Sequence, residues 1–355
     1  MERRRAKIAA VQAAPVWLDR NATVEKACGL IEEAGAEGAD LIGFPENFIP
    51  GHPSWYYFHP AASAKSVSLA VKLFHESVEV PGDATDALCK AAARAKINVV
   101  MGVTEKVAGT TGTLYNTQLF IDSSGQLVGK HQKLVATASE RLVHAPGRAE
   151  TQRSFPSEIG VVSALVCGEN SNPLAVARIG ADYPNVHVAS WPNNFSQASA
   201  GMPENSLLAS RSVAYSCSCF VIASCSVNSE AMISDLAANE ADAAFMRDTS
   251  KTGGACIINP SGVVVAGPMP GDQEGILYAD ADFDACIRAR FVHDFAGHYN
   301  RSDVYQLRVF TQSSDLVTAP LRAAQAEQVS RSMVEPDGGQ RGDEGDPIAP
   351  SPVRL

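Results

Sequence analysis

The chain has 355 residues, of which 45% are hydrophobic and 19% charged, a composition typical of a soluble globular protein with a sizeable core. Its formal net charge of −10 argues against nonspecific binding to nucleic acid or to anionic membranes, which requires a basic face. No apolar stretch approaches the roughly 20 residues of a membrane-spanning helix, so a membrane protein is not expected.

The first segment bears on where the protein resides. Residues 1–5 carry the positive charge of a signal peptide, but the apolar run that follows is interrupted by Gln12 and stopped by Pro15. We therefore expect a buried first strand and a cytoplasmic protein. The cysteines are then expected as free thiols, and the motif at 217–219 lacks the spacing and histidine partners of a zinc site. We expect no metal and no cofactor.

Short apolar strands alternate with helical stretches along the chain. The first helical stretch places Val24, Ala27 and Ile31 on one face and Glu25 largely opposite. This alternation predicts an α/β layered architecture. The expected strands are 7–13, 40–45, 97–104, 114–121, 127–133, 160–166, 186–191, 219–225, 254–258 and 275–281, and the expected helices are 22–37, 83–96, 172–181 and 204–217.

Three strand ends carry the side chains of a nucleophilic site. An apolar strand ends at Cys167, and the turn and helix that follow would bring the thiol to a helix N-terminus, which favours thiolate. Two other strands end at Glu46 and Lys133. A buried carboxylate can accept the thiol proton, and an ammonium can stabilise negative charge on a substrate. Each residue alone is more often structural or solvated, so it is their combination that indicates catalysis.

Three segments carry a family resemblance. Phe-Pro-Glu-Asn-Phe-Ile-Pro-Gly-His-Pro (44–53), Lys-His-Gln-Lys-Leu (130–134) and Cys-Gly-Glu-Asn-Ser-Asn-Pro-Leu-Ala (167–175) occur in this order. Together they resemble the Glu–Lys–Cys carbon–nitrogen hydrolases, the nitrilase superfamily, and most closely its nitrilase branch. The match extends through 139–141, 190–192 and 297–304, so it covers about residues 7–310.

The resemblance implies a four-layer α-β-β-α sandwich and a role for each matched residue. Cys167 would attack a nitrile carbon to give a thioimidate, and Glu46 would be the general base. Lys133 would stabilise the tetrahedral intermediate, and Glu140 would orient Lys133 and the substrate. The backbone N–H of Gly168 would help to bind the developing negative charge.

The resemblance also suggests residues of the substrate pocket. Trp55 and Tyr56 follow the general base in a loop that borders the pocket in this family, and aromatic walls suit an apolar nitrile substituent. Packing in the core or in a subunit interface is an equally good interpretation of both. Trp191 and Asn193 follow a strand end in the second half and are candidates by the same resemblance.

Other residues near the motifs receive structural interpretations. We expect Glu169 to brace the cysteine turn, and we expect His131 to pack, because nothing adjoining supplies an orienting acid. The chain departs from the family pattern at Ala136, Gly168 and His144, where the family often has proline, a bulky aromatic and an aromatic. None of these changes removes a reacting group, so they bear on substrate preference.

The resemblance implies a nitrilase that needs no cofactor and works as a homo-oligomer, either a dimer or a larger spiral. We expect a catalytic domain over 1–315 and a disordered or assembly-related tail over 316–355, which is rich in glycine, proline and charge. An amidase of the same superfamily and a cyanide- or nitrile-hydrating lyase are the alternatives. A non-enzymatic scaffold is disfavoured because all four expected polar groups are present.

Overall fold

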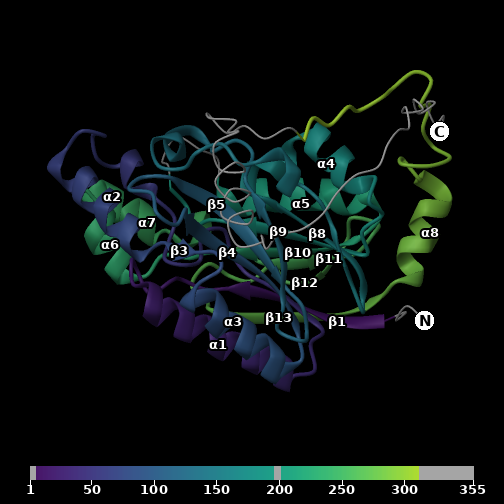
Figure 1. Ribbon diagram of the computed structural model, residues 1–355, viewed down its shortest axis with the longest axis horizontal. Helices are drawn as coiled ribbons and strands as arrows, with labels where there is room; N and C mark the ends of the chain where they lie inside the picture. Colours follow the sequence, from purple (N-terminus) through teal and green to yellow (C-terminus); the bar gives the residue numbers. More distant parts are fainter. Residues whose placement is uncertain (1–4, 196–200, 312–355) are drawn as a thin grey trace, which may run out of the picture. The chain divides into compact units, whose positions relative to one another are not determined.

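The computed structural model describes residues 5–195 and 201–311 (Figure 1). The expected tail over 316–355 lies outside the described residues, so the expected domain boundary stays a prediction. Within the described ranges, no helix has the length and apolar character needed to cross a membrane. All eight cysteines lie in these ranges, and each is a free thiol.

Strands of the N-terminal half, together with β13 from later in the chain, form a first sheet in the order β6-β5-β4-β2-β1-β13. Strand β1 pairs in parallel with β2 and antiparallel with β13, while β4, β5 and β6 form an antiparallel meander. The short β3 pairs with β4. The bounds are β1 Arg5–Gln12, β2 Leu41–Gly43, β3 Val78–Glu79, β4 Asn98–Lys106, β5 Leu114–Ile121, β6 Leu127–Gln132 and β13 Gly275–Asp282.

The second half builds a second sheet in the order β7-β8-β9-β10-β11-β12. Its central strands β8, β9 and β10 are parallel, and both edges are antiparallel. A single parallel pairing of Gln12 in β1 with Cys225 in β10 joins the two sheets. The bounds are β7 Phe155–Ser157, β8 Gly160–Val166, β9 Val186–Trp191, β10 Phe220–Cys225, β11 Cys256–Ile258 and β12 Val264–Ala266.

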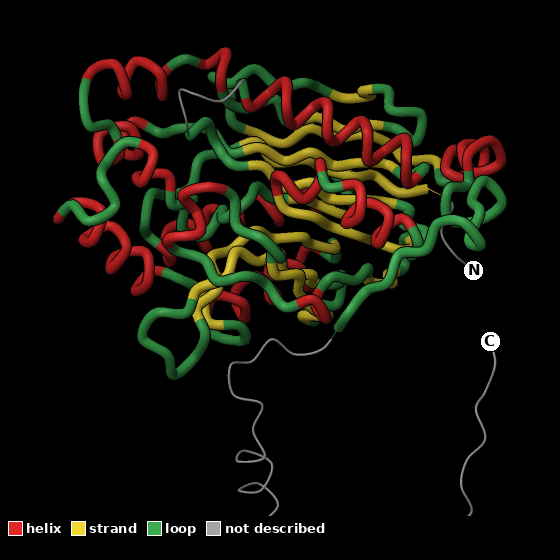
Figure 2. The backbone as a smooth tube through the Cα atoms, turned by 90° about the horizontal axis from the view of Figure 1, so that it is seen from above, coloured by secondary structure: helices red, strands yellow, loops and turns green. Residues whose placement is uncertain are grey.

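The alternation of side chains along the strands explains the layers. In β1, Ile8 and Ala10 join a core that also contains Val188 and Ile222 of the second sheet, so these faces of the two sheets pack together. The opposite face of β1 packs against α1 and α3 in a separate core, and α4 and α5 cover the outer face of the second sheet. Figure 2 shows the strands inside with helices on either side. The expected four-layer α-β-β-α sandwich is confirmed.

The predicted helices are present, and the described residues contain four more that were not predicted. Helix α1 begins after Asp19, whose side chain accepts a hydrogen bond from the N–H of Ala22. Helix α2 was missed although it buries Leu69 and Leu73 on one face, and it exposes Val67 and Val71. The bounds are α1 Arg20–Ala36, α2 Ala64–Glu76, α3 Asp83–Ala95, α4 Pro173–Gly180, α5 Met202–Cys217, α6 Glu230–Leu236, α7 Glu240–Arg247 and α8 Asp284–His293.

Candidate active site

The candidate nucleophile stands on a sharp turn between β8 and α4. Cys167 directly follows the last residue of β8 and has φ +49°, in the left-handed region that costs a non-glycine residue on the order of 1–3 kcal/mol. The buried amide of Asn170 stabilises this turn by donating to the carbonyls of Leu165 (3.1 Å) and Cys167 (3.0 Å). His187 bonds in turn to the Asn170 carbonyl oxygen at 2.8 Å. The turn is therefore stabilised by the buried hydrogen bonds of Asn170 and His187.

Glu169 ties this turn to the segment that carries the lysine. Its carboxylate accepts hydrogen bonds from the N–H of Val166 (3.1 Å) and from the N–H of Leu134 (2.8 Å), and it lies 2.8 Å from Nε2 of His131. The expected bracing role of Glu169 agrees with these contacts. The expectation that His131 has no acidic partner is wrong, because the acid comes from a turn far along the chain.

Two glutamates and a lysine meet in the interior beside the thiol. Nζ of Lys133 lies 2.7 Å from Oε1 of Glu46 and 2.7 Å from Oε2 of Glu140, and all three side chains are buried. Glu46 reaches this place because its loop packs directly against β4 at Gly102. This close packing requires glycine, because a Cβ at position 102 would come 2.0 Å from the carbonyl oxygen of Pro45. The predicted catalytic carboxylates and ammonium thus converge.

Asn116 on β5 was not predicted, and it bridges the two glutamates. Its Nδ2 donates to Oε1 of Glu46 (2.6 Å) and to Oε1 of Glu140 (2.7 Å). Glu140 also accepts from the N–H of Thr137 (2.9 Å) and lies 3.0 Å from Nδ1 of His144. Glu140 is therefore held by four partners, whereas Oε2 of Glu46 is buried without any partner among the described residues.

The two glutamates differ in ionisation because their surroundings differ. Burial raises the pKa of Glu46 to about 7, with the charge of Lys133 opposing it and that of Glu140 adding to it. Burial also acts to raise the pKa of Glu140, but Lys133 and the hydrogen bond from His144 hold that pKa well below its usual range. Glu140 is therefore a fixed anion at neutral pH. Glu46 can gain or lose a proton there, as a general base must.

The thiol is a weaker acid than the sequence suggested. Burial raises the pKa of Cys167 well above its ordinary value, and the charge of Glu46 adds to this, while Lys133 and the N–H of Gly168 oppose it. The expectation that a helix N-terminus favours the thiolate is therefore wrong: desolvation and two carboxylates outweigh it. The nucleophile rests as a thiol and needs a base to activate it.

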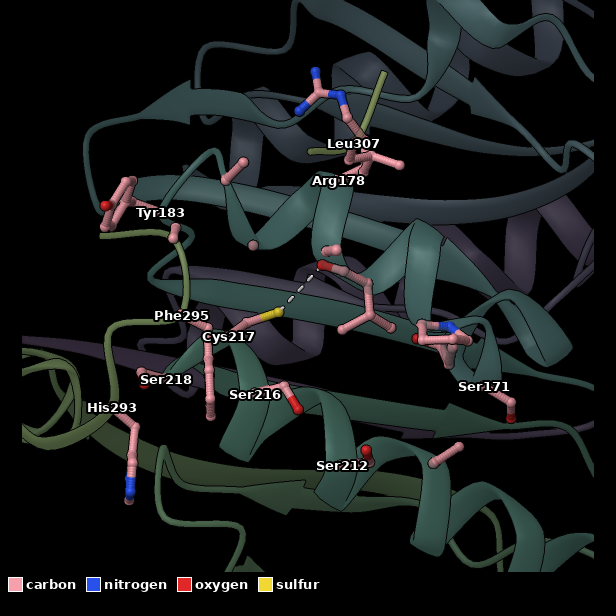
Figure 3. Close-up of a pocket in the computed structure, with 18 of the residues that line it drawn as sticks. Ser171, Arg178, Tyr183, Ser212, Ser216, Cys217, Ser218, His293, Phe295 and Leu307 are labelled. Carbon is pink, nitrogen blue, oxygen red and sulfur yellow. Dashed lines mark hydrogen bonds between the residues drawn. The ribbon is translucent and has the colours of Figure 1, made fainter. Parts of the chain in front are cut away.

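A cavity of about 1140 Å³ opens from the thiol. Its inner end is lined by Cys167, Gly168, Trp191 and Phe195, and its outer part lies between α4, α5 and the segment 293–309. Figure 3 shows this outer part, where side chains of α4, of α5 and of the C-terminal segment surround one space. The thiol is therefore buried and yet reachable by a small molecule.

Comparison with known proteins identifies the family. Residues 7–291 match the carbon–nitrogen hydrolase family. The chain belongs to this family. It is 37% identical to a nitrilase of Bacillus sp. (strain OxB-1) over 83% of this chain and 85% of that protein, and 38% identical to a nitrilase of Pseudomonas syringae pv. syringae (strain B728a) over 85% and 88%. These relatives place the hydrolase on the nitrilase branch of the family.

Solved structures of the family share the fold of this hydrolase. A carbon–nitrogen hydrolase from Helicobacter pylori G27 superposes with a TM-score of 0.64 at 16% identity, covering 82% of this chain and 94% of that one. The NitFhit protein of C. elegans superposes with a TM-score of 0.65 at 17% identity, covering 89% of this chain and 70% of that one. At such identities the likeness concerns the fold alone.

The predicted pocket residues of the hydrolase fall into two groups. Gly168 and Trp191 line the cavity, and the indole N–H of Trp191 donates to the hydroxyl of Ser210 at 3.2 Å. Trp55 is fully buried in a core with Tyr56 packed against it, so both follow the alternative interpretation considered above. Asn193 is buried and does not line the cavity, and its side-chain amide donates to Oδ1 of Asn228 at 2.6 Å.

Besides the predicted Trp191, the wall of the cavity near the thiol contains Phe195, an aromatic residue that was not predicted. Phe195 lines the cavity and packs against Tyr57, with ring centroids 4.8 Å apart, and against His52, with centroids 5.6 Å apart. Tyr57 stands one position after the predicted Tyr56 in the same short helical turn. None of residues 55–58 lines the cavity, and the ring of Tyr57 packs against Phe195, which does.

One group of side chains in the described part of the hydrolase has the composition of a metal site. Ligand atoms of Glu46, His52 and Glu140 all lie within 4.8 Å of one another. The ammonium of Lys133, at 2.7 Å from both carboxylates, already supplies a positive charge at this place. The expectation that no metal is bound stays a prediction.

Proposed function

We propose that this hydrolase converts an organic nitrile and two water molecules into a carboxylic acid and ammonia. The observation that carries the proposal is the buried cluster of Glu46, Lys133 and Glu140 acting on the thiol of Cys167. The relatives support the nitrile class: besides those above, they include an aliphatic nitrilase of Rhodococcus rhodochrous at 36% identity and an arylacetonitrilase of Aspergillus kawachii at 33%.

The first step would form a covalent bond between the enzyme and the substrate. Glu46, with a pKa of about 7, takes the thiol proton as the sulfur of Cys167 attacks the nitrile carbon. One of the two π bonds between carbon and nitrogen breaks, and Glu46 passes the thiol proton to the nitrogen. The product is a thioimidate, and Glu46 is ionised again. Lys133 and the N–H of Gly168 stabilise negative charge that develops on nitrogen.

Water then releases the nitrogen and afterwards the acid. A first water adds to the thioimidate carbon and gives one proton to Glu46, which passes it to the nitrogen. The second water proton then moves from the new hydroxyl group to the nitrogen, and the tetrahedral intermediate expels ammonia to leave a thioester. A second water hydrolyses the thioester and returns the proton to the sulfur of Cys167. Lys133 remains charged in these steps because the two carboxylates raise its pKa well above the ordinary value, although burial opposes them. Its role is therefore electrostatic.

The product distinguishes this function from its alternatives. An ammonia-release screen over aliphatic, aromatic and arylacetic nitriles and their matched amides, with chromatography of the products, separates the three activities. We expect mainly carboxylic acid and ammonia from nitriles. Mostly amide would indicate a hydrating lyase, and turnover of amides without turnover of any nitrile would indicate an amidase.

The variant Cys167→Ala tests the covalent mechanism. It should release no ammonia while its melting temperature stays within a few degrees of the wild type, and substantial turnover by this variant would contradict the covalent mechanism.

Self-association and a cytoplasmic location are part of the proposal. Large apolar side chains are exposed along α8 and the segment after it, among them Phe291 (84%), Tyr305 (74%) and Phe310 (75%). Apolar exposure of this extent supports burial in a subunit contact. The free cysteines support a reducing compartment. Light scattering at micromolar concentration should detect a dimer or a larger assembly, and a monomer would argue against this part.

A further inference from the structure

His52 is a buried ring beside the catalytic carboxylates that the mechanism above does not use. It lies on the loop after β2, is 4% exposed, and stacks on Phe195. Phe195 lines the cavity together with Cys167, so the ring of His52 is in contact with a residue of the cavity wall. The position is close enough for the charges of Glu140 and Lys133 to act on the imidazole.

Two polar atoms at this place have no hydrogen-bond partner among the described residues. Nδ1 of His52 and Oε2 of Glu46 are both buried, and neither forms a hydrogen bond within the part of the chain that the structure describes. A ring nitrogen of His52 lies within 4.8 Å of a carboxylate oxygen of Glu46. Neither of the two unpartnered atoms forms a direct hydrogen bond with a described residue, and a single water can bridge groups that lie within this distance of each other. Ordered water is the usual partner of such buried groups.

The ionisation of His52 suits it to hold a water. Burial lowers the pKa of His52 to about 3, although the charge of Glu140 acts to raise it. The imidazole is therefore neutral in the pH range in which Glu46 titrates, and one of its nitrogens is a hydrogen-bond acceptor. The ammonium of Lys133 is a donor only and cannot replace it.

We propose that His52 and Glu46 together hold the water that hydrolyses the acyl-enzyme, which makes His52 a further catalytic residue. The inference rests on the proposed function, but it needs only the thioester that nitrile and amide hydrolysis share. The water oxygen bonds to the acyl carbon, one water proton moves to Oε2 of Glu46, and the other O–H bonds to a ring nitrogen of His52. The intermediate then expels the sulfur of Cys167, which takes the proton back from Glu46.

The test is a competition between water and added hydroxylamine for the acyl-enzyme of the purified, full-length protein. A bound and oriented water accelerates hydrolysis of the acyl-enzyme but does not accelerate its reaction with hydroxylamine. His52→Phe keeps a ring that can stack on Phe195 and removes both nitrogens. The ratio of hydroxamic acid to carboxylic acid should therefore rise by about tenfold or more, as expected for loss of a positioned nucleophile.

A matched control uses the same change at a neighbouring position. His59→Phe alters a half-buried histidine that follows the same loop but does not belong to the group of Glu46, His52 and Glu140, and its product ratio should equal that of the wild type. If folded His52→Phe has a lower kcat with the wild-type ratio, His52 only packs and the proposal is overturned. If His52→Phe does not fold, His52→Leu, which also lacks a polar atom, is judged by the same ratio.

The competition also separates this inference from the proposed function. If the wild type hydrolyses amides and no nitrile, the nitrile proposal fails. The same measurement on an accepted amide then still tests His52. An unchanged ratio on that amide overturns the role of His52, and an increased ratio supports it.

Discussion

Replacing Asn116 with leucine removes the amide that donates to both glutamates and keeps a side chain of similar volume. The hydrogen bond from Asn116 is one of the contacts that lower the pKa of Glu46, which burial raises to about 7. Glu140 loses a donor as well, but the ammonium of Lys133 keeps that carboxylate ionised. The variant should therefore act mainly through the protonation of Glu46.

The size of the effect follows from the strength of one hydrogen bond to a charged group. Such a bond contributes about 1.5–3 kcal/mol, and one pKa unit corresponds to about 1.4 kcal/mol. The pKa of Glu46 in Asn116→Leu should thus rise by about one to two units. A base that is about half ionised at pH 7 would become roughly 5- to 50-fold less ionised there, and activity should return as the pH rises.

The assay is the pH dependence of kcat/KM for ammonia release by the wild type and the variant. We expect the acidic limb of the wild type near pH 7 and that of Asn116→Leu one to two units higher. Asn98→Leu is the matched control, because Asn98 is a buried amide on β4 that donates to the carbonyl of Asp40 at 2.9 Å, away from the site. An acidic limb that stays in place in folded Asn116→Leu would refute the assigned role of Glu46 as the titrating base.

Three further variants test the site in other ways. Lys133→Met keeps the length of the side chain and removes its charge, so kcat should fall by about a hundredfold or more, and near wild-type kcat would show that Lys133 is misassigned. Glu140→Gln should change the acid-to-amide ratio of the products or abolish turnover, and an unchanged ratio at full activity would contradict its orienting role. Burial acts to raise the pKa of Glu169, but His131 and two backbone N–H groups hold it below the ordinary 4.5. Its charge therefore stabilises the fold above about pH 4.5 and stops doing so as the pH falls through the lowered pKa. Glu169→Gln should lower the melting temperature at pH 7 and differ little from the wild type in acid, whereas an equal loss at both pH values would exclude this origin.

The sandwich and its nucleophile turn could be predicted because their signals are local. The run Gly160–Val166 has the apolar character of a buried strand, and the glycine and asparagine after Cys167 mark the turn. The first strand is equally clear, because apolar and small residues continue up to Gln12. Such patterns need only neighbouring residues, and the family resemblance added the order of the three motifs.

The electrostatics could not be predicted because they depend on residues that meet only in three dimensions. A helix N-terminus beside Cys167 suggested a thiolate, but burial and the charge of Glu46 reverse this. Asn116 lies in the middle of a buried strand, and only the pairing of β5 with its neighbours shows that its amide points at the glutamates. His131 likewise has its acid at Glu169, a separation in sequence that no local pattern reveals.

The division of the fold into two sheets has a consequence for how the enzyme can fail. The base and the ammonium, Glu46 and Lys133, come from strand ends of the first sheet, whereas Cys167 comes from the second. Hydrogen bonds cross between the sheets beside the site, from the hydroxyl of Ser190 to the carbonyl of Phe44 at 2.7 Å and from Gln118 to Ser190 at 2.8 Å. The catalytic rate therefore depends on how accurately the two sheets are aligned with each other. A small slip of one sheet against the other would inactivate the protein while its secondary structure remained intact.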